Sequence, residues 1–219
     1  MLFAQIVLFD GFDPLDVVAP FEVLAAASEA AGGGLAVELV AADGPRRVTG
    51  GTLGLALEAT ARLDPDRPGY VIVPGASGPI AGDPDEGAET IPVLLARFAD
   101  SAAVPLLRAA MRNPRVTVAG VCGGSLALAM AGLLEGRHAV THRLGLDVLD
   151  ATGVRAVDAR VVDDGDVVTA GGVTSGLDLA LHLAEREFGP RVAHAVETLF
   201  EYDRRGIVWR NAGRAPVEF

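Results

Sequence analysis

The sequence contains one cysteine, Cys122, and it stands where two structural patterns meet. The apolar run RVTVAGV (residues 115–121) precedes it and predicts a buried strand, while GSLALAMAGLL (residues 124–134) predicts a helix. Gly123 and Gly124 lie between the two patterns and permit a sharp turn with close backbone packing. A strand, a turn carrying the reactive side chain and a helix form the layout of a nucleophile elbow. We expect the free N–H groups at the helix start to favour a Cys122 thiolate.

A second interpretation of Cys122 is that it fills space in the core. Free cysteine is among the most frequently buried residue types and behaves as a small hydrophobe. Composition alone favours this interpretation, whereas the position of Cys122 at the end of a strand favours a reactive thiol.

Carboxylates and backbone amides follow two other strand ends. Asp13 and Asp16 come after the first apolar run, and Asp16 lies near the start of a predicted helix. Asp16 is therefore either a helix-capping or first-turn acid, which stabilises the helix, or a buried carboxyl whose raised pKa lets it donate a proton. In the turn VPGASG, the N–H groups of Gly75 and Ala76 form a candidate nest for a developing negative charge.

Of the four histidines, His138 and His142 are at the two ends of the strand-like segment HAVTH, so they do not share a helical face as metal ligands would. His182 and His194 belong to two different predicted helices. We interpret each as structural or exposed. The sequence predicts no metal site.

These residues must be positioned by a regular alternation of apolar strands and helices. The predicted strands are residues 4–9, 35–42, 70–75 and 115–121, with hairpins at 46–60 and 158–172. The predicted helices are residues 15–31, 89–101, 102–113, 124–134, 176–189 and 191–203. Continuous apolar strands between helices predict a mostly parallel sheet covered on both faces, in a single α/β domain over residues 1–219. Ligands bind beyond the carboxyl ends of such strands, here residues 9–16, 75–78 and 121–124.

Composition limits the class of partner. The formal net charge of −11 argues against nucleic acid and against an anionic membrane surface. A single cysteine forms no internal disulfide, which fits a reducing compartment. The N-terminus lacks the positive flank of a signal peptide, and no apolar run reaches the roughly 18 residues of a membrane span. We therefore predict a cytoplasmic protein that acts on a small molecule.

Three segments together resemble the ThiJ/PfpI superfamily, the cysteine branch of the class I glutamine amidotransferase-like fold. They are LFDGFDPLDVVAPFEVL (residues 8–24), VIVPG (71–75) and GVCGGSLALAMAGLLEGRHAVTH (120–142). The resemblance covers nearly the whole chain and implies a flavodoxin-like three-layer α/β/α sandwich, a homodimer and no cofactor. It also implies that Cys122 is the nucleophile, that Asp16 is its acidic partner, and that the amides around Gly75, Ala76 and Gly123 bind developing charge. Ser77, Gly124 and Thr174 are the further pocket candidates.

Within that superfamily, AGLLEGRHAVTH (131–142), AGGVTSGLDLALHL (170–183) and EYDRRGIVWRNAG (201–213) are most similar to isonitrile hydratases and to the amidase-like halves of AraC-type regulators. The chain departs from the isonitrile hydratase pattern at three positions. Gly123 stands where a threonine is usual, Ala76 where a second glycine is usual, and Arg143 where a tryptophan is usual. The segment 77–104 is also long, which suggests a lid over the pocket.

The resemblance implies an isonitrile hydratase-like enzyme, which converts an isonitrile and water to an N-substituted formamide. Cys122 would attack the isonitrile carbon to give a thioimidate, and Asp16 would supply the proton. Two alternatives stay open: a thiol-dependent enzyme of the same superfamily that acts on a larger natural product, and a non-catalytic ligand-binding or redox-sensing module.

Overall fold

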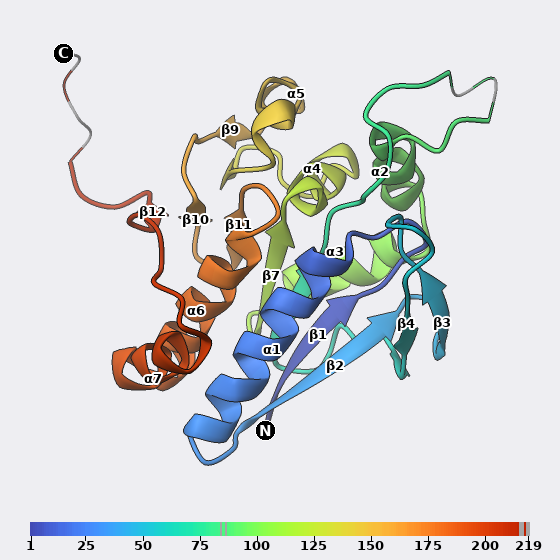
Figure 1. Ribbon diagram of the computed structural model, residues 1–219. Helices are drawn as coiled ribbons and strands as arrows, with labels where there is room; N and C mark the ends of the chain where they lie inside the picture. The colour runs from blue at the N-terminus through green and yellow to red at the C-terminus, as the bar shows by residue number, and fades with distance from the viewer. Residues whose placement is uncertain (84, 86, 215–216, 218–219) are drawn as a thin grey trace.

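An eight-stranded sheet forms the centre of the computed structural model, which describes residues 1–83, 85, 87–214 and 217 (Figure 1). Five neighbouring strands are parallel and lie in the order β2–β1–β6–β7–β11. These strands are β1 (Leu2–Val7), β2 (Leu35–Ala41), β6 (Gly69–Val73), β7 (Val116–Val121) and β11 (Val167–Ala170). Numbered along the chain, their order is 2-1-3-4-5, which is the flavodoxin-like order. The predicted parallel sheet is confirmed.

Shorter strands extend the sheet at both edges. β5 (Ala61–Arg62) pairs with β2 in parallel. At the other edge, β10 (Val161–Asp163) is antiparallel to β11, which confirms the predicted hairpin, and β12 (Trp209–Arg210) pairs with β10. Two further pairs lie outside the sheet: the predicted hairpin β3 (Arg46–Thr49) with β4 (Ala56–Ala59), and β8 (His138–Ala139) with β9 (Arg155–Ala156).

Helices cover both faces of the sheet. One layer contains α1 (Pro14–Ala30), α6 (Ser175–Phe188) and α7 (Pro190–Phe200), whose apolar residues share one core cluster. The other contains α2 (Ile91–Ala99), α3 (Ala103–Arg112) and α4 (Gly123–Met130), whose apolar residues share a second cluster. A 3₁₀ turn, η2 (Arg143–Gly145), leads into α5 (Leu146–Ala151), which contacts α4. No helix in the described part of the chain is long and apolar enough to cross a membrane.

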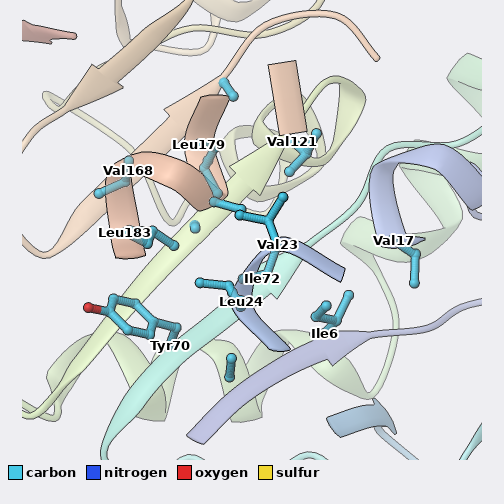
Figure 2. Close-up of a cluster of buried hydrophobic side chains, with 14 of the residues drawn as sticks. Ile6, Val17, Val23, Leu24, Tyr70, Ile72, Val121, Val168, Leu179 and Leu183 are labelled. Atoms are coloured by element: carbon cyan, nitrogen blue, oxygen red, sulfur yellow. The ribbon is translucent and has the colours of Figure 1, made fainter. Parts of the chain in front are cut away.

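Successive strand residues point to opposite faces and so feed the two cores. Ile6 packs in the core under α1 and α6, while its neighbour Val7 packs in the core under α2 and α3. Figure 2 shows the first core, in which Ile72 and Val121 of the sheet meet Val23 of α1. Because helices cover both faces of the parallel strands, apolar residues predominate in them, with Gln5 of β1 and Glu38 of β2 among the exceptions.

Two sequence expectations need correction. The helix expected over residues 124–134 ends at Met130, because the chain turns there through Gly132, whose φ is +68°. The segment 77–104 is not a lid throughout its length. Its residues Ile91–Ala99 form α2, and Leu94, Leu95 and Phe98 of that helix are buried in the core. Residues 84 and 86 of the segment lie outside the described residues.

Candidate active site

Three loops at the carboxyl edge of the sheet meet at Gly75. The loop after β1 ends at Asp13, and Asp16 lies in the first turn of α1. The loop after β6 carries Gly75, and Cys122 follows β7. Gly75 donates its N–H to Asp16 Oδ2 at 2.9 Å and accepts from the Asp13 N–H at 2.8 Å. A Cβ atom on Gly75 would lie 2.7 Å from the nitrogen of Gly123 and 2.8 Å from Asp16 Oδ2. Only glycine therefore lets the carboxyl group and the start of α4 approach this closely.

Cys122 has the strained backbone expected of a nucleophile elbow. Its φ is 54° and its ψ is −126°, a conformation that residues with a side chain rarely adopt. The Cys122 N–H donates to the Ala170 carbonyl at 3.0 Å, and the Cys122 carbonyl accepts from Thr141 Oγ1 at 2.7 Å. Hydrogen bonds on both sides thus hold the turn, and the strand–turn–helix geometry predicted from the sequence is confirmed.

Asp16 is fully buried, and its side chain points inward to the site. The helix cap is Asp13, whose side chain accepts from the Leu15 N–H at 2.9 Å, so Asp16 is not the cap. Asp16 does lie in the first turn of α1, as the other structural interpretation expected. Burial, together with the negative charge of Asp13, raises the pKa of Asp16 well above its ordinary value of 3.8. Hydrogen bonding by Gly75 and by the Cys122 thiol lowers the pKa by less. Asp16 Oδ1, the other carboxyl oxygen, has no hydrogen-bond partner among the described residues.

The expected thiolate is not favoured at Cys122. Burial and the charge of Asp16 raise the pKa of the thiol to about 12, and the N–H groups of Val173 and Gly123, which face the sulfur, lower it by less. The helix start does act in the predicted direction, but the cost of burying a charge is larger. Two negative charges side by side are unfavourable, so ionisation of the Asp16 carboxyl and of the Cys122 thiol is coupled. Each group therefore keeps its proton to a higher pH than it would in water.

The backbone amides are arranged differently from the sequence expectation. The Gly75 N–H is occupied by Asp16, while the Gly123 N–H faces the Cys122 sulfur. Ala76 forms an isolated antiparallel bridge with Phe12, which ties the loop after β6 to the loop after β1. The Val173 amide was not identified from the sequence. Its position just beyond the end of β11, at the same sheet edge, is the signal that points to it.

The three pocket candidates have structural partners. Ser77 Oγ lies 2.9 Å from Thr52 Oγ1, and Thr174 Oγ1 accepts from Arg160 at 3.0 Å. A Cβ atom on Gly124 would lie 2.1 Å from the Val73 carbonyl oxygen, so this glycine allows α4 to pack against the end of β6. At Gly123, a Cβ atom would lie 3.0 Å from Leu95 Cδ1, so a core side chain of α2 takes the space beside the position where a threonine is usual.

A cavity borders the turn at Cys122, although neither Cys122 nor Asp16 is among the residues that line it. Its volume is about 420 Å³. Thr141, whose hydroxyl binds the Cys122 carbonyl, forms part of its wall, as do Gly171 and Gly172, which precede Val173. The cavity therefore borders the elbow from the side of β11.

The histidines stay outside the Cys122–Asp16 pair. His182 is buried with its Nε2 2.8 Å from Asp163 Oδ2, and His138 Nδ1 lies 3.2 Å from Asp164. His142 Nδ1 accepts from the Leu144 N–H at 3.2 Å at the start of η2. Within the described ranges, no three histidine, cysteine or acidic side chains are grouped as metal ligands.

Known proteins share this fold and much of this sequence. A model of the DJ-1/PfpI family matches residues 94–186. The isonitrile hydratase of Pseudomonas putida is 34% identical over 197 residues, which cover 89% of this chain and 76% of that protein. The chain belongs to the DJ-1/PfpI family. A crystal structure of a THiJ/PfpI family protein from Pseudomonas syringae has a TM-score of 0.75 and 25% identity, and the match covers 97% of this chain and 79% of the other.

Membership of the DJ-1/PfpI family confirms the predicted superfamily and its three-layer fold. It does not by itself define a reaction. The HTH-type transcriptional regulator CdhR of Pseudomonas aeruginosa is 36% identical over 110 residues, which cover 49% of this chain and 32% of the regulator. A relative named as an enzyme is thus similar to most of this chain, and a relative named as a regulator is similar to about half of it.

Proposed function

We propose that this protein hydrates an isonitrile to an N-substituted formamide, with Cys122 as nucleophile and Asp16 as the group that delivers and recovers the proton. The observation that carries the proposal is the fully buried Asp16 carboxyl, with its raised pKa, beside the Cys122 thiol at a strained elbow. The identity to an isonitrile hydratase over most of the chain supports the same reaction.

In the first step the thiol adds to the isonitrile carbon, and this step can begin with both Asp16 and Cys122 protonated. The terminal carbon of an isonitrile both accepts a nucleophile and takes up a proton. Asp16 gives its proton to that carbon while the Cys122 sulfur bonds to it, and the thiol proton passes to Asp16. The product is a thioimidate, R–N=CH–S–Cys122, and the carboxyl is again protonated. A high thiol pKa is compatible with this step because no free thiolate has to accumulate.

The second step returns the thiol. Water adds to the thioimidate carbon, the nitrogen gains a proton, and the carbon–sulfur bond breaks to release R–NH–CHO. The sulfur leaves with a developing negative charge, which the N–H groups of Gly123 and Val173 stabilise until it is protonated. Both protons gained by the organic product come from water overall, so the enzyme ends unchanged.

The test is turnover on a panel of aryl and alkyl isonitriles, with formamide measured by NMR. We expect Cys122→Ala and Asp16→Asn each to lower the rate by about a thousandfold or more. Glu22→Gln is the matched control, because it neutralises an exposed acid of the same helix, α1. That variant should retain most of the activity. Absence of turnover by the wild type across the panel would defeat the proposal.

A second candidate is a ligand-binding module without turnover, favoured by the similarity to the regulator CdhR over half of the chain. It predicts ligand binding in the cavity with no change in the ligand. A redox sensor fits the site less well, because peroxide oxidises thiolates and burial raises the pKa of Cys122 to about 12. We propose a homodimer that acts on small molecules, on the basis of the family resemblance, and sedimentation velocity tests the dimer.

A further inference from the structure

The cavity that borders the Cys122 turn has a small apolar wall and several charged side chains. Val140 and Leu146 provide apolar surface, and Thr141 connects the cavity to the Cys122 carbonyl through its hydroxyl. The charged side chains in the wall are Arg143, Asp158 and Arg160. They come from three different places: η2, the loop after β9, and the residue just before β10.

Two of these charges have no ionic partner among the residues that the structure describes. Arg143 and Asp158 are both exposed, and neither forms an ion pair or a side-chain hydrogen bond with the described residues. Arg160 differs, because it binds Asp178 at 2.7 Å and also donates to the Tyr202 hydroxyl. The cavity therefore presents one available guanidinium and one available carboxylate.

The presence of one positive and one negative side chain in the same cavity disfavours ligands that carry a single charge. A simple anion attracted by Arg143 would also meet the Asp158 carboxylate, in a protein whose formal net charge is −11. A simple cation would meet the Arg143 guanidinium in the same way. A neutral alkyl group would gain no charge-assisted contact with Arg143 or Asp158, both of which are exposed and would stay hydrated. A ligand that carries both an ammonium and a carboxylate group satisfies both, and charge-assisted hydrogen bonds of this kind are the strong ones.

We propose that the cavity binds a zwitterionic head group, an ammonium next to a carboxylate as in an α-amino acid, through Asp158 and Arg143. This inference rests on the proposed function in one respect: the head group belongs to the organic substituent of the isonitrile. Val140 and Leu146 would then contact the methylene chain that leads from the head group to the isonitrile carbon at Cys122. Arg143, which stands where the resemblance places a tryptophan, becomes a residue that determines specificity.

The experiment compares four isonitriles that differ only in the far end of the chain. One ends in an α-amino acid, being lysine or its shorter homologues with the side-chain amine replaced by an isonitrile. The others end in a carboxylate alone, an ammonium alone or a methyl group. We expect kcat/KM for the amino acid to exceed that for each of the others by at least about tenfold. A carboxylate-only isonitrile that performs equally well would overturn the assignment.

Variants assign the preference to its residues. Arg143→Leu and Asp158→Asn should each reduce kcat/KM for the amino-acid isonitrile by about tenfold or more and leave the methyl-ended isonitrile unchanged. Arg112→Leu, an exposed arginine on α3 in the layer of α2 and α4, is the matched control and should change neither. Equal losses on all four isonitriles would show a structural effect and contradict the role in recognition.

A binding measurement separates this inference from the proposed reaction. Calorimetry with the Cys122→Ala protein uses lysine formylated on its side-chain nitrogen, which is the formamide expected from the amino-acid isonitrile. Binding that Arg143→Leu weakens by about tenfold or more supports the head-group site even if no isonitrile is turned over. Turnover of all four isonitriles at equal efficiency, without binding of the formyl-lysine, overturns the head-group site and leaves the hydratase standing.

Discussion

At the scale of single residues, Asp16 is the clearest conflict between function and stability. Its carboxyl is fully buried, and its pKa is raised well above 3.8 by burial and by Asp13. Below pH 3.8 the group is protonated in both the folded and the unfolded chain. Above that pH the unfolded chain ionises more readily, so this residue makes the folded state less stable as pH rises. Such a group is retained at a cost to stability, as is common at functional sites.

Asp16→Asn should therefore raise the melting temperature at pH 7 while it removes activity. The gain should shrink toward pH 3.5, because wild-type Asp16 is then protonated without cost. Thermal unfolding at the two pH values measures this difference, and Asp147→Asn, which replaces an exposed acid at the start of α5, is the control. A wild type that is more stable than Asp16→Asn at pH 7 would contradict the assignment.

The coupling of the two side chains is visible in the reactivity of the thiol. Since burial and the charge of Asp16 raise the pKa of Cys122 to about 12, wild-type alkylation by iodoacetamide should be slow at pH 8 and increase steadily up to high pH. Asp16→Asn removes the negative charge, so its profile should shift to lower pH. The rate of carbamidomethylation, followed by mass spectrometry, gives both profiles. Superimposable profiles would show that the residues are not coupled.

At the scale of elements, Gly75 sets the distance between the loop after β1 and the start of α4. In Gly75→Ala the new methyl group would meet Gly123 and Asp16, both in well-packed positions, so we expect a loss of about 1–3 kcal/mol in unfolding free energy and a large loss of activity. Chemical denaturation measures the first effect and isonitrile turnover the second.

Gly176→Ala is the matched control for that variant. Gly176 is a helical glycine in α6, and the nearest atom to its Cβ position is Val121 Cγ1 at the ordinary contact distance of 3.4 Å. The extra methyl group should leave stability unchanged or raise it, because alanine is the better helix former. Equal losses of unfolding free energy in Gly75→Ala and Gly176→Ala would contradict the claim that the close contacts at Gly75 require glycine.

The elements of the parallel core are the part of the fold that the sequence predicts best. Strands β1, β6 and β7 are buried over most of their length, so apolar residues predominate in them, with Gln5 and Thr117 as the polar exceptions. The two-residue strands β5 and β12 escape prediction, because they pair through the backbone and carry no periodic pattern. Their positions depend on which edge strand they pair with, which is β2 for β5 and β10 for β12.

The sequence likewise predicts some features of the candidate site and not others. Asp16, Gly75 and Cys122 are brought together because the carboxyl ends of parallel strands share one edge, which the sequence pattern already implies. The pKa of the Cys122 thiol could not be predicted, since it depends on how completely the helices cover the sulfur. The use of the Gly75 N–H by Asp16 and the approach of the Val173 N–H to the sulfur likewise depend on loop geometry.

At the scale of the whole molecule, Asp163 joins the outer strands to the helix layer. Its carboxylate lies at the end of β10 and meets His182 at 2.8 Å, and Arg186 and Arg210 at 3.5 Å each. Burial alone would raise the pKa of Asp163, but the hydrogen bonds from His182 and Gly165 and the charge of Arg186 lower it to about 2. The carboxylate thus holds α6 and β12 against β10.

The stability that Asp163 provides is present above pH 3.8 and is lost as pH falls from 3.8 to about 2. Asp163→Asn should therefore cost about 2 kcal/mol at pH 7 and much less at pH 2. Urea unfolding at the two pH values tests this difference. Asp150→Asn, at an exposed acid of α5, should show no comparable loss. An equal cost at both pH values would mean that the ion pairs are not its source.

The central claim, that Cys122 attacks the isonitrile carbon, is tested most directly by mass spectrometry of the intact protein, quenched with acid during turnover. We predict an adduct whose mass equals protein plus isonitrile, located on Cys122, that forms more slowly in Asp16→Asn and is absent in Cys122→Ala. Its decay in the wild type should match the appearance of formamide. Formamide production by Cys122→Ala at the wild-type rate, without an adduct, would contradict the account.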